Sequence, residues 1–153
     1  LFMEIKITNM SLSDENGPTI VFSGISSAIC ISMDVHISPD LWAFAANNQT
    51  RIEAKFMVLD PLNHTVIWSG TWPHALLRSL GGPDFYLSVG NCWGPPSDYT
   101  TPEQMGLNFP GSYDDRKYVF GAYGMVYLLD YPYVFDVFST FKWFMVKPET
   151  RID

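Results

Sequence analysis

ICISMDVHI, residues 29–37, alternates apolar and polar side chains along its whole length. Alternation with a period of two is the pattern of a β-strand with one buried face and one solvated face. The apolar face of this strand carries Ile29, Ile31, Met33, Val35 and Ile37. The other face carries Cys30, Ser32, Asp34 and His36. We therefore predict a half-buried strand whose cysteine lies on the polar face.

Extended patterns recur along the chain and are separated by clusters of Gly, Pro, Asn and Asp. They predict about eight strands, at residues 2–10, 19–25, 28–37, 51–59, 64–72, 84–90, 117–129 and 133–147. The two runs on either side of Pro61 make the clearest hairpin, because proline presets the backbone of a tight turn. HALLRSL, residues 74–80, predicts two helical turns that end at Gly81.

About eight strands, with no helix longer than two turns, predict an all-β fold. We expect an antiparallel β-sandwich with jelly-roll or immunoglobulin-like topology. The chain has 153 residues, enough to bury one core without the help of a metal or a disulfide. It holds no internal repeat and no low-complexity segment. We therefore expect one β-sandwich domain over residues 1–153.

The two cysteines test the immunoglobulin alternative. Trp42 follows Cys30 by 12 residues and Cys92 follows it by 62, which is close to the Cys, Trp, Cys spacing of immunoglobulin domains. Two observations oppose that interpretation. An inter-sheet disulfide belongs on the core face, whereas Cys30 is predicted on the polar face. Gly90 also stands where a tyrosine corner would have its Tyr. We expect two unpaired thiols, with a Cys30–Cys92 bridge as the alternative.

One long segment between strands, residues 91–112, has no regular pattern and reads NCWGPPSDYTTPEQMGLNFPGS. Its prolines prevent continuous pairing in a sheet. A single helical turn is predicted after Thr101, with Pro102 at the first helical position. Loops of this length are uncommon in compact domains and usually have a function. Its aromatic and aliphatic side chains give it enough apolar surface to pack, so we predict an ordered, functional loop.

The last two predicted strands, 117–129 and 133–147, are apolar on both faces. The short connection Asp130-Tyr131-Pro132 predicts that they are antiparallel neighbours. A strand that is apolar on both faces is either covered twice within the fold or covered by a partner. This pattern supports self-association.

The charge pattern limits the partners. Nine Lys and Arg residues against 16 Asp and Glu give a net charge of −7, and no basic patch could follow a phosphate backbone. Nucleic acid is therefore not an expected partner.

No apolar run reaches the roughly 18 residues of a membrane-spanning helix, and the first residues lack the pattern of an export signal. Three Asn-X-Ser/Thr triplets, at Asn9, Asn48 and Asn63, point to a secretory route. We expect a soluble, secreted or extracellular protein.

Patterns of catalytic or metal sites are weak. Asp34 and His36 share one strand face about 7 Å apart and could both reach one metal ion. No further ligand follows them at a suitable spacing, so we expect a solvated face and no metal. The sequence has neither a Gly-X-Ser-X-Gly nucleophile motif nor a glycine-rich phosphate loop. We expect no cofactor and no enzyme. A small hydrolase would require His36 to meet carboxylates from other strands.

Aromatic residues beside Pro, Gly, Asp and Asn in the loops are the strongest functional signal. Flat rings held near polar groups can stack on sugars or apolar ligands. The candidate ligand-binding residues are Trp93, Tyr99, Asp98, Asn91, Tyr113 and Trp72. The predicted function is a non-catalytic, lectin-like recognition module for a glycan or a protein ligand. The alternative is a self-assembling subunit of a coat, pilus or inclusion, a homo-oligomer that associates through 117–129 and 133–147.

Overall fold

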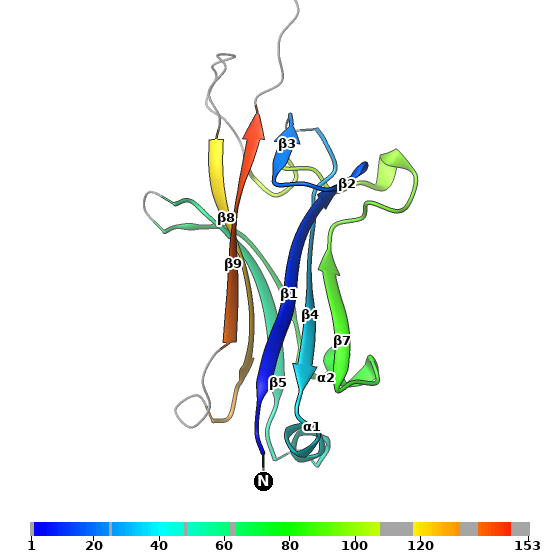
Figure 1. Cartoon of the computed structure of the whole chain (residues 1–153), viewed down its shortest axis with the longest axis vertical. Helices are drawn as coiled ribbons and strands as arrows, with labels where there is room; N and C mark the ends of the chain where they lie inside the picture. The colour runs from blue at the N-terminus through cyan, green and yellow to red at the C-terminus, as the bar shows by residue number, and fades with distance from the viewer. Residues whose placement is uncertain are drawn as a thin grey trace, which may run out of the picture.

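The computed structural model describes residues 2–24, 26–47, 49–61, 64–107, 118–131 and 138–147. Two packed sheets form a β-sandwich (Figure 1), which confirms the predicted fold class. The first sheet has the order β2(Gly17–Pro18), β1(Ile5–Asp14), β4(Cys30–Ile37), β7(Asp84–Val89). The second sheet has the order β3(Val21–Ser23), β9(Phe138–Lys147), β8(Tyr118–Leu128), β5(Ile52–Leu59), β6(Val66–Trp72).

The strand order is immunoglobulin-like. Strands β1, β4 and β7 correspond to A, B and E of an immunoglobulin domain, and β6, β5, β8 and β9 correspond to C′, C, F and G. All of these neighbours pair antiparallel, and the short β3 runs parallel to β9. The predicted pairing of the last two strands is thereby confirmed. Their last registered pair is Val126 with Phe138, and residues 132–137 of the connection lie outside the described residues.

The core lies between the sheets, where the predicted alternation holds. On β5, alternate residues from Ile52 to Val58 are buried, and on β4 the apolar face of ICISMDVHI is buried. Strands B and F of an immunoglobulin domain are joined by a disulfide, but here Met33 and Gly124 meet instead. A Cβ on Gly124 would lie 2.8 Å from Met33 Sδ. The fold therefore has the immunoglobulin strand order without a disulfide between its sheets.

Two short α-helices lie at one end of the sandwich, opposite the segment that follows β7 (Figure 1). The predicted helix is α2(His74–Ser79), after which Gly81 takes a positive φ of 78°. Helix α1(Pro39–Ala46) lies between the predicted strands 28–37 and 51–59, where no helix was predicted. Its start has Pro at the first position and an acidic first turn, and it buries Leu41 and Ala45, which share one face. In the described part of the chain, no helix is long and apolar enough to cross a membrane.

His74 gives the stability a specific dependence on pH. Its Nδ1 accepts a hydrogen bond of 3.0 Å from the backbone N–H of Ile52, which only the unprotonated nitrogen can do. Burial, then the positive charges of Arg78 and Arg51, lower the pKa of His74 below its ordinary 6.5.

Stability should therefore fall as the pH drops below about 6.5, because the unfolded chain then binds a proton before the folded chain does. Thermal unfolding between pH 8 and pH 5 measures this loss. The variant His74→Asn should show a smaller loss over the same range, since His36 and His64 remain in both proteins. Equal losses in the two proteins would contradict the prediction.

Candidate functional site: polar hollows on the first sheet

The outer face of the first sheet carries a strip of polar side chains from three adjacent strands. In register across the sheet, Ser11 of β1 faces Ser32 of β4, and Asp34 of β4 faces Tyr86 of β7. The hydroxyl oxygens of Ser11 and Ser32 lie 2.7 Å apart and are hydrogen-bonded. The polar face predicted for residues 29–37 is thus continued by polar residues on both neighbouring strands.

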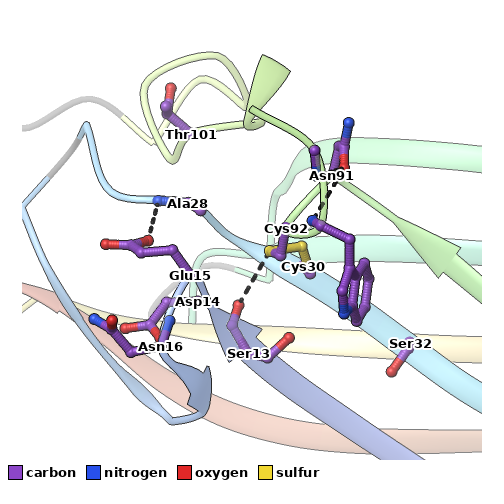
Figure 2. The surroundings of a disulfide bond; sticks show 12 residues. Ser13, Asp14, Glu15, Asn16, Ala28, Cys30, Ser32, Asn91, Cys92 and Thr101 are labelled. Carbon is purple, nitrogen blue, oxygen red and sulfur yellow. Dashed lines mark hydrogen bonds between the residues drawn. A yellow bond between two sulfur atoms is a disulfide. The ribbon is translucent and has the colours of Figure 1, made fainter. Parts of the chain in front are cut away.

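A disulfide joins Cys30 to Cys92 at one end of this strip (Figure 2). The prediction of two unpaired thiols was wrong, although the predicted face of Cys30 was right. Ile31 pairs with Val89 across β4 and β7, so the residues that follow β7 come next to Cys30. They cover the polar face at this end, and Cys30 is only 1% exposed. The bridge therefore connects β4 with the segment that follows β7, the strand next to β4 in the same sheet. It does not connect the two sheets.

Gly90 allows the segment after β7 to lie close to the backbone of Ile29. Its φ is +87°, and a Cβ at this position would lie 2.2 Å from the backbone oxygen of Ile29. The variant Gly90→Ala should lose about 2 kcal/mol or more of the free energy of unfolding, because backbone must move to remove the clash.

The matched control is Gly81→Ala. Gly81 also has a positive φ, of 78°, but a Cβ there would meet nothing within 4 Å, so only the conformational cost of about 1 kcal/mol is expected. Urea unfolding of both variants makes the comparison. Equal losses of the free energy of unfolding in the two variants would show that the clash with Ile29 does not contribute to the loss.

The segment after β7 has an anchored part and an exposed part. The backbone N–H of Ile29 donates to the oxygen of Thr100 at 2.8 Å. Thr101 Oγ1 accepts from the N–H of Gln104, and Gln104 Oε1 accepts from the N–H of Thr101, which is a capping box and supports the predicted cap. Met105 and Leu107 are buried in the core. The anchored part thus fixes the exposed part, residues 93–98, at the rim of the first sheet.

Trp93 is the most exposed large apolar side chain of the described residues, at 71%. Asn91 Oδ1 accepts hydrogen bonds from the backbone N–H of Trp93 at 3.2 Å and of Gly94 at 3.1 Å. This Asx-type turn, which begins at Asn91 next to Cys92 (Figure 2), orders the backbone that carries the indole. Asn91 was predicted as a ligand-binding residue, and the structure gives it a role in positioning Trp93.

Trp93 lines a hollow of about 450 Å³, which we call the Trp93 hollow. Its other lining residues are Ser11, Ser13, Asp14, Glu15, Asn16, Gly17, Pro18, Ser32, Tyr86 and Cys92. Asp14 accepts from the N–H of Asn16 at 2.8 Å, and Glu15 accepts from the N–H of Ala28 at 3.0 Å. Both carboxylates are therefore already oriented by the backbone (Figure 2).

A second hollow of about 320 Å³, the His36 hollow, lies on the same strands. Its lining residues are Thr8, Asp34, Val35, His36, Asp84, Phe85 and Tyr86. His36 Nδ1 lies 2.5 Å from Asp84 Oδ1, so the structure brings His36 to a carboxylate from another strand. Both side chains are well exposed, at 38% and 74%. Among the described residues, no group of three or more His, Cys, Asp and Glu could hold a metal ion.

Three of the remaining predicted ligand-binding residues, Asp98, Tyr99 and Trp72, do not line the Trp93 hollow. Asp98 is exposed in the 3₁₀-turn η1(Pro96–Asp98), and Tyr99 follows it half-buried. Trp72 lies on β6 in the second sheet and packs against the core. Tyr113 lies outside the described residues.

The residues that build the floor of the site were not predicted from the sequence. They are the outward side chains of three strands, chiefly Ser11, Ser13, Ser32 and Tyr86. The period-two pattern placed only Ser32 on a polar face. Ser11 and Ser13 lie in the part of β1 that extends beyond the predicted strand 2–10. Their convergence depends on β1 and β7 flanking β4.

Comparison with known proteins gives no family. No protein-family model matches the chain, and no curated protein matches it in sequence.

Proposed function

We propose that this protein is a non-catalytic, lectin-like recognition module that binds carbohydrate in the Trp93 hollow. The observation that carries the proposal is an exposed indole held by an ordered turn beside a cavity lined with hydroxyl and carboxylate oxygens. Aromatic rings stack on the apolar faces of sugars, and oriented oxygens accept the hydrogen bonds of sugar hydroxyls. Tyr86, 51% exposed, supplies a second ring.

Charge favours a neutral sugar. Among the described residues that line the two hollows, none is Lys or Arg, so an anionic sugar would have no cation to pair with. The carboxylates of Asp14 and Glu15 are both held by backbone N–H groups. They are suited to accepting hydrogen bonds in fixed directions.

The proposal of a non-catalytic role rests on the environment of His36. The pair of His36 and Asp84 is open to solvent, where an ion pair or hydrogen bond is weak. Thr8 Oγ1, a hydroxyl in the same hollow, donates to the backbone oxygen of Asp34 at 3.4 Å. An activated nucleophile needs a base within hydrogen-bond reach. Recognition is the better supported use of this face.

The test is binding to a glycan array that holds neutral, amino and acidic sugars, followed by titration of each sugar that is retained. Trp93→Ala should weaken binding at least about tenfold, because an exposed stacking ring is removed. Its melting temperature should change little, since Trp93 is exposed. Trp143→Ala, an exposed indole on the second sheet, is the matched control and should leave binding unchanged. Unchanged binding together with a large loss of stability in Trp93→Ala would refute the proposal.

We also propose that the protein is secreted or extracellular. The Cys30–Cys92 disulfide supports an oxidising compartment. Of the three glycosylation triplets, Asn9 is exposed on β1, while Asn48 and Asn63 lie outside the described residues. Mass spectrometry of the protein from a eukaryotic secretory host would detect a glycan on Asn9.

A second candidate function is self-assembly through the outer face of the second sheet. Strands β8 and β9 bury one face in the core, and the other face carries an exposed aromatic cluster. Phe141 packs edge-on against Trp143 and Tyr123, with ring centroids 4.6 Å and 5.4 Å away. Trp143 is 49% exposed. Light scattering at high concentration tests this candidate: Trp143→Ser should reduce the mass of any oligomer, and a monomeric wild type would exclude it.

A further inference from the structure

The two hollows on the first sheet meet at a single side chain. Tyr86 lines both the Trp93 hollow and the His36 hollow. On β7, Tyr86 lies between Ser88, which faces Ser32, and Asp84, which faces His36. The two hollows therefore follow one another along the strands, on one face of one sheet, with the Tyr86 ring at their junction.

From this arrangement we propose that the site binds an extended, neutral oligosaccharide that runs along β4 from Trp93, over Tyr86, to His36 and Asp84. The inference rests on the proposed function and specifies its ligand. The stretch from Cys30 to His36 spans six residue steps of about 3.3 Å, roughly 20 Å in all. A single sugar ring would occupy only part of that length.

The lining groups change along this path. At the Trp93 end, the indole offers a stacking face, and the half-buried hydroxyls of Ser11 and Ser13 lie in the same hollow. Ser32, 6% exposed, hydrogen-bonds Ser11 from below. At the other end, the imidazole of His36 and the carboxylate of Asp84 offer a hydrogen-bonding pair that is open to solvent. Tyr86 is placed to contact the sugar units that pass between them.

Neutral sugar is favoured over a basic peptide as the occupant. Asp14, Glu15 and Asp84 all have partners within the protein, two of them backbone N–H groups and the third His36. Such carboxylates are held in fixed directions, which suits the directional hydrogen bonds of sugar hydroxyls. The serine hydroxyls on the floor likewise suit the hydroxyl groups of a sugar.

The experiment is calorimetric titration of the intact protein with linear, β-1,4-linked oligomers of glucose, N-acetylglucosamine and mannose, from one to six units. Affinity should rise with length beyond two units and then level off when the path is filled. Tyr86→Ala should weaken binding of the longest oligomers by about tenfold or more. His36→Ala should weaken the longest oligomers severalfold and leave the shortest unchanged, whereas Trp93→Ala should weaken every length. Val66→Ala, at an exposed apolar residue on β6 of the second sheet, serves as the unaffected control.

The outcomes separate this inference from the proposed function. If affinity is the same at every length and only Trp93→Ala reduces it, the site is confined to the Trp93 hollow. In that case the extended path is refuted, while the proposed function stands. If no oligomer binds at any length, both are refuted. Binding of oligolysine in place of sugar, abolished by salt, would assign the face to a basic peptide and would also overturn both.

Discussion

Replacing Cys30 and Cys92 together by alanine should lower the free energy of unfolding by about 4 kcal/mol. The two residues are 62 positions apart, and a cross-link that closes so long a loop removes much conformational entropy from the unfolded chain. The loss is a large fraction of the 5–15 kcal/mol that stabilises a typical domain. Urea unfolding monitored by tryptophan fluorescence measures it.

Two comparisons make the disulfide prediction specific. Reduction of the wild-type protein by a thiol reductant should shift the unfolding midpoint nearly as far as the double replacement does. The double variant itself should not respond to the reductant. A double variant with the midpoint of the oxidised wild type would show that the cross-link does not stabilise the folded protein.

The disulfide also connects stability with the candidate site. Cys92 lies between Asn91, which orders the turn, and Trp93, which lines the hollow. Cys92 itself is a lining residue, and its Sγ lies 3.9 Å from the backbone oxygen of Ser13 on β1. We therefore expect the double variant to lose affinity for the sugars that the wild type retains on the array. Gly90→Ala should impair the same binding, because it disturbs the same approach of the chain to β4.

Much of the fold could be predicted from the sequence because it depends on local patterns. The alternation in residues 29–37 correctly placed Ile31, Met33, Val35 and Ile37 in the core, although Cys30 and Ser32 of the polar face are buried as well. The same reasoning found β5, β6, β7 and α2 close to their observed bounds. Helix α1 was missed because it begins with Pro39 and Asp40 and is followed by Asn47, and these residue types also mark loops. The spacing of Leu41 and Ala45 was too short a signal to decide between helix and loop.

The disulfide and the floor of the site could not be predicted, because both depend on which strands are neighbours. Cys30 approaches Cys92 only because β7 pairs with β4, although the two strands are separated by α1, β5, β6 and α2. A cysteine on a polar face can be a free thiol, or it can form a disulfide with a segment that covers that face. The alternation alone does not distinguish the two. Tyr86 was assigned to an ordinary strand for the same reason. Its place between two hollows follows from the pairing of β1, β4 and β7.

Phe56→Ala should be the most damaging single replacement in the core, with a loss of about 3–5 kcal/mol in the free energy of unfolding. Phe56 is 0% exposed at the centre of the second sheet. Its partners across the sheet are both glycines, Gly124 on β8 and Gly70 on β6. The space that side chains at these two positions would take is filled by Trp68 over Gly70 and by Met33 over Gly124.

The two glycines are the reason that the cavity left by Phe56→Ala should persist. Neither has a side chain that could rotate into the space, and Met33, which packs over Gly124, already has its own place in the core. The cost of a cavity rises with the volume that the surroundings fail to refill. Phe56→Leu should therefore recover part of the loss. Met57→Ala, one residue along on the outer face of β5, should cost about 1 kcal/mol or less. Chemical denaturation of the three variants tests the argument, and similar losses for Phe56→Ala and Met57→Ala would contradict it.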